Sequence, residues 1–473
     1  MLMVFSSIAW RPHVETGVEV ALRARENGED VCYVDLTKFL RGDESYYPIH
    51  KLIDVPFIRS NNALRILRSQ CVRSLVEGVD PSLEKRAGMI AKDILKTIKT
   101  HEQFLSIGYE GFHDLGWAAL SSAVSYKKDS TIRYETDSRY ITGWVEIAIR
   151  AYLKAKDIMS RESPSEVVAY NGRFATTRAV IRAADYMGLR WKVYEVGASV
   201  RKYRFHDYLP HDRDRVQEDV KKYSGRGADV WGEEFFLARR GLSRSKENVF
   251  IKKQEKGVLP EDLSSDYKWV VYFSSSDDEM VAIGGDAQHP VFYDQEFALK
   301  CLKKAISEID GLRLCVRVHP HVSKKSKNDR RKWASLAEQW PDVLFVGPNE
   351  EVDTYALLEE AHVVASFGST VGVEATYWGK PSLLLGRSFY DRLGVCGQPQ
   401  SLSEMVGFLL NPEVFDRKGA LLYGAYMTTF GIDYKFYEAE SYGKGKILGK
   451  DIDDSFLLRG VKALKRSVAC IGG

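Results

Sequence analysis

The run Arg317-Val318-His319-Pro320-His321 combines residue types that bind and protonate phosphates. It ends an apolar stretch, 312–318, that predicts a buried strand, and open α/β sheets bind ligands where their strands end. Arg317 could bind a phosphate through two parallel hydrogen bonds, and His319 could donate to a phosphate oxygen or protonate a leaving phosphate. Pro320 ends the strand and stiffens the turn. Taken alone, however, a His-Pro pair is more typical of a structural turn.

Gly368, Ser369 and Thr370 separate a predicted strand over His362–Ser366 from a predicted helix over Val371–Trp378. The free N–H groups at the start of that helix and the two hydroxyls could together bind a phosphate. A Ser or Thr at such a position is more often a simple N-cap. The motif gains weight because it falls at the same predicted sheet edge as the His-Pro turn.

Two further groups are predicted at this edge. Glu374 lies one turn into the helix, where a carboxylate could accept from both hydroxyls of a ribose, although an ordinary exposed glutamate is the plain alternative. Ser274, Ser275 and Ser276 follow an apolar strand over Trp269–Phe273 and would supply hydroxyls. Contact with a ligand and a polar N-cap are about equally good interpretations of these serines.

Candidate acceptor-binding residues follow the predicted strands of the N-terminal half. Glu195 ends a strand over Trp191–Glu195 and could serve as a general base. The other candidates for holding an acceptor or a sugar are His13, Glu110, Asn171, Arg173 and Arg178. The spacing of Arg173, Arg178 and Arg182 could bring some of them onto one helix face to hold an anion, or they could be plain surface charges.

Two series of alternating strands and helices must position these residues. Met3–Ile8, Thr16–Asn27 and Asp30–Leu36 are predicted to form a strand, a helix and a strand, which is typical of a parallel sheet. Between 269 and 385, five predicted strands alternate with four predicted helices, the pattern of a doubly wound fold. We therefore expect an α/β protein with two Rossmann-like domains that face each other across a cleft.

The expected domain boundaries follow from changes in composition. Residues 1–260 would form an acceptor-side domain with a helical insertion and a basic, loop-rich connector from about 198. Residues 261–425 would form the nucleotide-binding domain, and 426–473 would pack back across the cleft. The charge runs of the connector are predicted to be solvated.

The composition is that of an ordinary soluble globular protein, with 473 residues of which 44% are hydrophobic and 28% charged. The 68 Lys and Arg exceed the 65 Asp and Glu by only +3, so the net charge does not predict a nucleic-acid partner or a polybasic membrane binder, and any anion site must be local. Six cysteines form no C-x-x-C pair, so a reducing compartment is favoured. No apolar run approaches the roughly 18 residues of a spanning helix, and the short apolar start is predicted to be a strand rather than a signal peptide. Neither predicted half opens with the G-x-G-x-x-G of a dinucleotide dehydrogenase.

Three segments resemble the nucleotide-binding half of GT-B glycosyltransferases, and most closely bacterial capsule polysaccharide biosynthesis enzymes, including β-Kdo transferases. They are YFSSSDDE (272–279), RVHPH (317–321) and SFGSTVGVEATYWGKPSLLL (366–385). The resemblance implies that His319, Ser369 and Thr370 bind the phosphate of a CMP-sugar and that Glu374 binds its ribose. It also implies that residues 171–197 belong to the domain that binds the acceptor.

These observations predict an inverting glycosyltransferase of capsule or O-antigen synthesis. It would transfer a sugar such as Kdo from a nucleotide-sugar, with a CMP-sugar favoured, to a glycan or glycolipid. Glu195 would be the base, and His319 would stabilise the leaving phosphate without a metal ion or other cofactor. We expect a cytoplasmic location, compatible with peripheral contact at the inner face of the membrane.

Three other functions share parts of this pattern. A UDP-N-acetylglucosamine 2-epimerase-like enzyme has a similar Ser/Gly turn followed by a glutamate. A CDP-glycerol-type polyol-phosphate transferase also uses a His-Pro turn. A non-catalytic partner in polysaccharide assembly or export would keep the sheets and fail to bind nucleotide.

Overall fold

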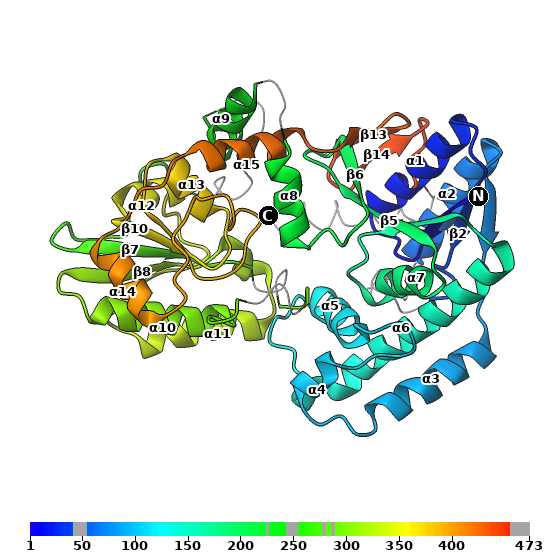
Figure 1. The fold of residues 1–473 in the computed structure, drawn as a ribbon, viewed down its shortest axis with the longest axis horizontal. Coiled ribbons are helices and arrows are strands. Elements are labelled where there is room, and N and C mark those ends of the chain that lie inside the picture. Colours follow the sequence, from blue (N-terminus) through cyan, green and yellow to red (C-terminus); the bar gives the residue numbers. More distant parts are fainter. Residues whose placement is uncertain (41–53, 224–226, 243–253, 277–280, 285–288, 455–473) are drawn as a thin grey trace, which may run out of the picture. The chain divides into compact units, whose positions relative to one another are not determined.

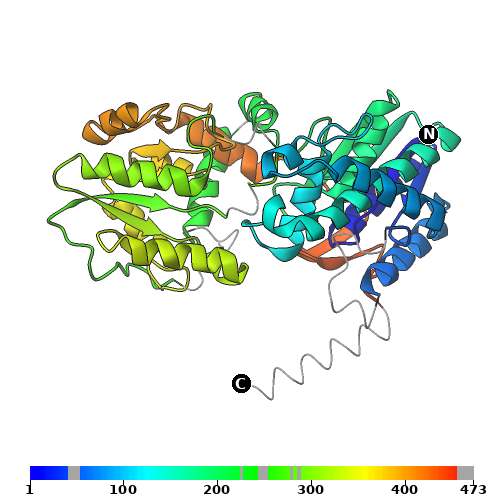
Figure 2. The same ribbon diagram turned by 90° about the horizontal axis from the view of Figure 1, so that it is seen from below.

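The computed structural model describes residues 1–40, 54–223, 227–242, 254–276, 281–284 and 289–454 (Figures 1 and 2). The chain forms two compact units, and each is described by itself. The first unit comprises 1–126, 132–210 and 430–473, and the second comprises 127–131 and 211–429.

The first unit is built on a seven-stranded sheet with the order β12-β6-β5-β4-β1-β2-β3. Its strands are β1 (Leu2–Ser6), β2 (Val31–Asp35), β3 (Arg73–Val76), β4 (Glu166–Tyr170), β5 (Arg190–Val196), β6 (Lys202–His206) and β12 (Ile432–Asp433). The first five of these strands pair in parallel, whereas β6 and β12 add to one edge in antiparallel pairs. Strands β1, β2 and β4 are apolar almost throughout, as expected of parallel strands covered on both faces.

Helices connect these parallel strands. They are α1 (His13–Glu26), α2 (Val55–Ser69), α3 (Pro81–Leu95), α4 (His101–Leu105), α5 (Leu115–Lys127), α6 (Tyr134–Glu162) and α7 (Ala175–Tyr186). The predicted opening of strand, helix and strand is confirmed as β1, α1 and β2. Three of the helices begin with clear sequence signals, because Asp54 and Asp80 cap helices with proline in the first turn and Thr100 forms a capping box.

The end of the described chain returns to the first unit. Strand β12 pairs with β6, and the hairpin of β13 (Tyr437–Ser441) and β14 (Lys444–Ile447) is fixed to α1. The buried Glu19 carboxylate accepts the N–H groups of Lys435, Phe436 and Tyr437 at 2.8 to 3.0 Å. Arg11 donates to the Asp451 carboxylate at 2.8 Å. The described part of the segment that we predicted to begin at 426 therefore joins the first unit over residues 430–454.

The second unit has a five-stranded, wholly parallel sheet with the order β11-β10-β7-β8-β9. Its strands are β7 (Lys268–Phe273), β8 (Leu312–Arg317), β9 (Leu344–Val346), β10 (Val363–Ser366) and β11 (Ser382–Leu384). Along β7, Val270 and Tyr272 join one apolar cluster while Val271 and Phe273 join another, so both faces of the sheet are buried. All five predicted strands are confirmed to within two residues at each end.

The helices of the second unit cover both faces of this sheet (Figure 1). They are α8 (Arg213–Lys221), α9 (Ala228–Arg239), α10 (Gln295–Ser307), α11 (Lys327–Gln339), α12 (Thr354–Glu360), α13 (Val371–Tyr377), α14 (Leu402–Leu410) and α15 (Lys418–Thr429), with a short 3-10 helix over Pro320–Lys324. In both sheets the first strand in chain order lies between the second and the fourth. The α/β class with two Rossmann-like units is thus confirmed, and their arrangement across a cleft stays a prediction.

The division between the units differs from the predicted boundary at 260. Helix α8 belongs to the second unit, where Gln217 donates to the Asp391 carboxylate at 2.6 Å. Helix α9 packs closely against α15: a Cβ atom added to Gly232 would lie only 2.3 Å from the Leu421 carbonyl oxygen. Long-range contacts, rather than the charge of the segment, decide where α8 and α9 pack.

Candidate active site

A pocket of about 360 Å³ lies at the carboxyl edge of the second sheet. The ends of β7, β8 and β10 meet there, at the point where the strand order reverses. All ten residues predicted to bind nucleotide line it: Ser274, Ser275, Ser276, Arg317, His319, Pro320, Gly368, Ser369, Thr370 and Glu374. The structure therefore brings together motifs that are up to 100 positions apart in the sequence.

His319 is held in one orientation by two hydrogen bonds. Its backbone N–H donates to the Ser274 hydroxyl at 2.8 Å, and its ring Nδ1 accepts the backbone N–H of His321 at 3.1 Å. An accepting Nδ1 carries no proton, so the neutral imidazole has its proton on Nε2. The turn thus presents His319 with a fixed donor nitrogen, which is the form needed to donate to a phosphate oxygen.

The turn after β10 is built from small residues. Gly368 has a φ of +136°, a backbone conformation that favours glycine. The Ser369 hydroxyl accepts the N–H of Val371 at 3.3 Å, while the Thr370 side chain makes no cap bond to the helix. Instead the Thr370 hydroxyl accepts from Arg239 at 2.7 Å. The N-cap interpretation therefore accounts for Ser369 but not for Thr370.

Both carboxylate oxygens of Glu374 accept hydrogen bonds from other side chains of the protein. The residue is 1% exposed, and its two carboxylate oxygens accept from the Arg239 Nε and from the Tyr355 hydroxyl, each at 2.6 Å. Burial lowers the pKa of Arg239, but Glu374 and nearby tyrosines outweigh that effect and leave this pKa raised. Each carboxylate oxygen still has a second lone pair for a ligand hydroxyl. A ribose would therefore share Glu374 with Arg239 and Tyr355.

Arg239 and Tyr355 are pocket residues that the sequence analysis missed. Arg239 ends α9 inside the run ARRGLSRSKEN, whose charges were predicted to be solvated. Tyr355 opens α12 and shows no local signal beyond an aromatic residue in a helix. Both reach the pocket because Glu374 lies between them, a relation that spacing along the chain does not reveal.

Arg317 was predicted to bind a phosphate, but its observed hydrogen bonds are to the protein backbone. Its two terminal nitrogens donate to the carbonyl oxygens of Gly347 and Glu350, the latter at 3.3 Å, and the residue is only 3% exposed. Burial lowers the pKa of Arg317. Two of its donors thus hold the loop after β9, whereas its Nε is buried with no hydrogen-bond partner among the described residues.

The serines after β7 have different surroundings. The Ser274 hydroxyl is used by His319, as described above. The N–H of Ser275 donates to the Gln295 side chain at 2.6 Å, while its buried hydroxyl has no hydrogen-bond partner in the described part of the chain. Ser276 lines the pocket. The acidic residues 277–279 of the same motif lie outside the described residues.

Glu195 lies at the carboxyl edge of the first sheet, at the end of β5. Its carboxylate accepts from the Asn171 side-chain amide and from the Val196 N–H. Burial raises the pKa of Glu195, against the opposing effects of Asn171, Val196 and Arg173. Tyr442, at the tip of the β13–β14 hairpin, is 66% exposed and interacts electrostatically with Glu195. The sequence analysis did not single out Tyr442.

The other predicted acceptor residues are mostly engaged within the protein. His13 stacks on Tyr170 with ring centroids 3.8 Å apart, and burial lowers its pKa to about 3, so it is neutral. Glu110 pairs with Lys156, and Arg173 lies over the ring of Phe174. Of these candidates, Asn171 donates a hydrogen bond to Glu195, and the charge of Arg173 acts on the same carboxylate.

Arg178 is buried rather than displayed to a ligand. It is 4% exposed and donates to the Gly172 carbonyl oxygen and to the Asp114 carboxylate. Arg182 binds the same carboxylate at 2.7 Å, which confirms that the four-residue spacing places both arginines on one helix face. The anion that they hold is a carboxylate of the protein, and the pKa of Asp114 is lowered as a result.

The described ranges contain no group of three or more His, Cys, Asp or Glu side chains that could hold a metal ion. None of the helices described there is long and apolar enough to cross a membrane.

Residues 233–437 match the family model of the capsule polysaccharide biosynthesis proteins. The match includes the whole second sheet and every residue that lines its pocket. The resemblance inferred from the motifs is thereby confirmed for this part of the chain, which is similar to the capsule polysaccharide biosynthesis proteins.

Several solved structures are similar to the chain. The β-Kdo 2,4 transferase KpsC of Thermosulfurimonas dismutans shows 16% identity and a TM-score of 0.39, over 56% of this chain and 80% of that chain. The UDP complex of S. aureus MnaA shows 12% identity and a TM-score of 0.31, over 90% and 92%. A UDP-N-acetylglucosamine 2-epimerase from Neisseria meningitidis shows 11% identity and a TM-score of 0.29, over 90% and 93%. No curated protein matches the chain.

Proposed function

We propose that the protein is a glycosyltransferase of bacterial capsule or O-antigen synthesis and binds a nucleotide-sugar in the pocket of its second unit. The observation that supports this most is the convergence of the His319 turn, the Gly368–Thr370 turn and the Arg239–Glu374 pair on one pocket. The pocket lies at the edge where open α/β sheets bind nucleotides, and within the region that matches the capsule family.

In the proposed donor complex, the phosphate lies against His319 and the turn before α13. The Nε2–H of His319 donates to a phosphate oxygen, and the positive charge of Arg239 offsets the charge that develops on the leaving nucleotide. The buried hydroxyl of Ser275 offers a further polar group. Glu374 accepts from the ribose hydroxyls while it stays bound to Arg239 and Tyr355.

The charge of the pocket favours a CMP-sugar. In the described part of the pocket the arginines are Arg239 and Arg317, and both already bind acceptors of the protein. That positive charge suits the single phosphate of a CMP-sugar better than the two phosphates of a UDP- or GDP-sugar. Kdo is the proposed sugar, because the motifs resemble those of β-Kdo transferases.

Glu195 is the proposed base. It takes the proton of an acceptor hydroxyl whose oxygen attacks the anomeric carbon, and the bond from that carbon to the phosphate oxygen breaks as CMP leaves. A raised pKa brings a carboxylate closer to the strength that such a proton transfer needs. A single displacement inverts the anomeric configuration. The acceptor is a glycan or glycolipid, and the reaction as written needs no metal ion.

We also propose a cytoplasmic location. Cys32, Cys71, Cys301, Cys315 and Cys396, the described cysteines, are all free thiols. Free thiols are typical of a reducing compartment.

The test is a panel of CMP-, UDP- and GDP-sugars, with calorimetry for CMP and UDP. We expect CMP to bind, and His319→Ala to weaken binding by roughly ten-fold or more, the value of a hydrogen bond to a charged group. His362→Ala is the matched control, because His362 precedes β10 at the opposite edge of the same sheet. Absence of binding by any nucleotide, or equal binding by the two variants, would overturn the proposal.

The products separate the remaining alternatives. An inverted glycoside together with free CMP supports the proposed reaction, and a retained configuration contradicts the single displacement. Free UDP with an epimerised sugar in the absence of acceptor would instead identify an epimerase. Phosphorus in the product would identify a polyol-phosphate transferase.

A further inference from the structure

Helix α3 of the first unit presents one strongly basic face. Lys85, Met89 and Lys92 are spaced by four and three residues, and Lys96, the C-cap, follows four residues later. These spacings place all four side chains on one face of the helix. All four are exposed, and Met89 is 65% exposed. We call these four residues the Lys85–Lys96 face.

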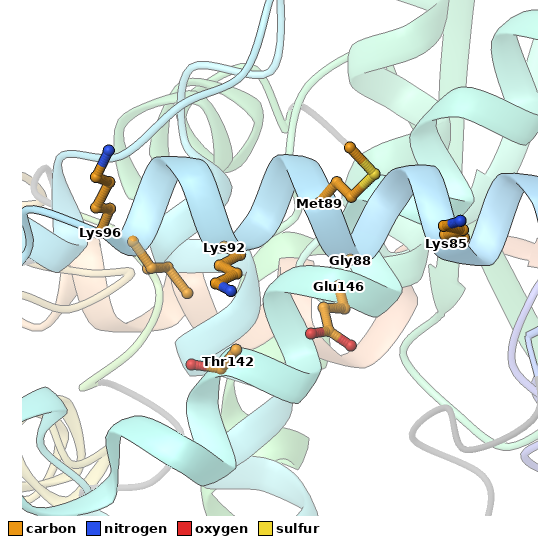
Figure 3. A pocket seen from close by; sticks show the side chains of 8 residues that line it. Lys85, Gly88, Met89, Lys92, Lys96, Thr142 and Glu146 are labelled. Atoms are coloured by element: carbon orange, nitrogen blue, oxygen red, sulfur yellow. The ribbon is translucent and has the colours of Figure 1, made fainter.

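The orientation of this face is fixed by packing. Ala87, Ala91 and Leu95 lie on the other side of α3 and are buried, and α3 packs against α6. A groove runs between the two helices, with Thr142 and Glu146 of α6 on its far wall (Figure 3). Because the alanines hold one side of α3 against the protein, the lysines and Met89 stay on the outside.

The lysines of this face have no ion pair with any described residue. Lysines of the neighbouring α6 differ, since Lys154 pairs with Glu77 at 2.8 Å and Lys156 pairs with Glu110 at 2.5 Å. The acidic side chains beside the face are Glu146 across the groove and Asp93 on the flank of α3. The three lysines outnumber these two carboxylates, so the face carries a net positive charge.

We propose that the Lys85–Lys96 face docks on the surface of an anionic phospholipid bilayer. Lysines extend an apolar stem and place their ammonium groups among lipid phosphates, and an exposed methionine between them can enter the headgroup region. A soluble acidic polysaccharide would also attract the lysines, but it would gain nothing from Met89. The combination of unpaired charge and an exposed apolar side chain therefore favours a lipid surface.

Sedimentation with vesicles tests this surface. The full chain is mixed with vesicles of phosphatidylglycerol and phosphatidylcholine, or of phosphatidylcholine alone, at low and at physiological ionic strength. We expect binding to the anionic vesicles only, weakened by salt. The variant K85Q/K92Q/K96Q should bind roughly 100-fold more weakly, since each lysine near an anionic surface contributes about a five-fold factor.

The variant K300Q/K303Q/K304Q is the matched control. It removes the same charge from α10 of the second unit and should retain binding within about two-fold. Met89→Gln should weaken vesicle binding by about three-fold and leave the salt dependence unchanged, because it removes only apolar contact. Thermal unfolding of each variant reports that its fold is intact.

Equal binding by K85Q/K92Q/K96Q and its control would overturn the proposal. So would binding of the wild-type chain to a soluble acidic polysaccharide such as heparin without binding to anionic vesicles. An unchanged affinity of Met89→Gln would contradict insertion of the methionine. Nucleotide binding measured on the same samples is independent of this face, so failure here and failure of the proposed glycosyltransferase reaction are distinguishable.

Discussion

The first five strands of each sheet are arranged in the same order, yet the residues at the carboxyl edges of the two sheets differ. In the first sheet, β4 ends in Tyr170, whose ring stacks on His13, and the next residue, Asn171, binds Glu195. In the second sheet, β10 ends in Ser366 and leads into a turn of small residues around a pocket. The fourth strands of the two sheets therefore lead into different surroundings: an asparagine that binds a glutamate in the first sheet, and a turn with Gly368, Ser369 and Thr370 that lines a pocket in the second.

The two edges also carry groups with different chemistry. The first edge carries a carboxylate whose pKa is raised by burial, together with a neutral histidine. The second edge carries a histidine with a fixed donor nitrogen and an ion pair between the partly exposed Arg239 and the buried Glu374. If the proposed function is correct, variants at the first edge change turnover and variants at the second edge change nucleotide affinity.

Glu195→Gln should have the largest effect. Loss of a general base lowers kcat by roughly 1,000-fold, while calorimetry should show unchanged affinity for CMP because the nucleotide binds at the other sheet. Glu166→Gln is the control, since Glu166 begins β4 at the opposite edge and pairs with Lys192 on the surface. Turnover within about ten-fold of wild type in Glu195→Gln would show that another group is the base.

Arg239→Met should have the next largest effect, and it acts at the second edge. Removing the arginine leaves the Glu374 carboxylate buried beside Tyr355, which costs about 3 kcal/mol of unfolding free energy. Nucleotide affinity should fall roughly ten-fold. Chemical denaturation and calorimetry measure the two effects on the same protein.

Two further variants separate these contributions of Arg239. The double variant R239M/E374Q removes the unpaired charge and should recover most of the stability without recovering the affinity. Arg240→Met removes a neighbouring arginine that pairs with the half-exposed Glu359, and should change stability by about 1 kcal/mol or less. Full stability in Arg239→Met would contradict a charged pair between Arg239 and Glu374.

The smallest expected effect is a displacement of the pH profile. Glu195 must be ionised to act as a base, and its pKa is raised by burial. The acid limb of kcat/KM should therefore fall at a higher pH than the ordinary glutamate value of about 4.3. A folded-state pKa above the unfolded value means that protonation of Glu195 does not itself destabilise the fold. Circular dichroism at the same pH values therefore separates loss of the base from unfolding, and a limb below 4.3 would contradict the assignment.

Local sequence patterns were sufficient for most of the second unit. Each of its strands is a short, mainly apolar run that is followed by polar or small residues, and both faces of the sheet are buried, so the runs are easily recognised. The residues directly after β7, β8 and β10 were predicted at one edge because parallel strands must bring their carboxyl ends together. This geometry explains why all ten predicted residues line one pocket.

Contacts between distant segments account for what the sequence analysis missed. The unit boundary at 211 depends on α8 and α9, whose partners lie about 175 to 195 residues further along the chain. Arg178 was predicted to hold a ligand, because its charge is visible in the sequence and its partner Asp114, 64 residues earlier, is not. Charged residues are therefore the ones for which local spacing is least informative about burial.

The position of α9 limits how the protein can be divided into fragments. A fragment that begins at 261 would contain the whole second sheet and all ten residues predicted to bind nucleotide, yet it would lack Arg239. Glu374 would then lose its cationic partner, and the groove of α15 against which α9 packs would be uncovered. A fragment spanning 211–429 keeps these contacts. Exchange of the nucleotide-binding unit between related proteins, in the laboratory or in evolution, would therefore have to carry the helices that precede the sheet.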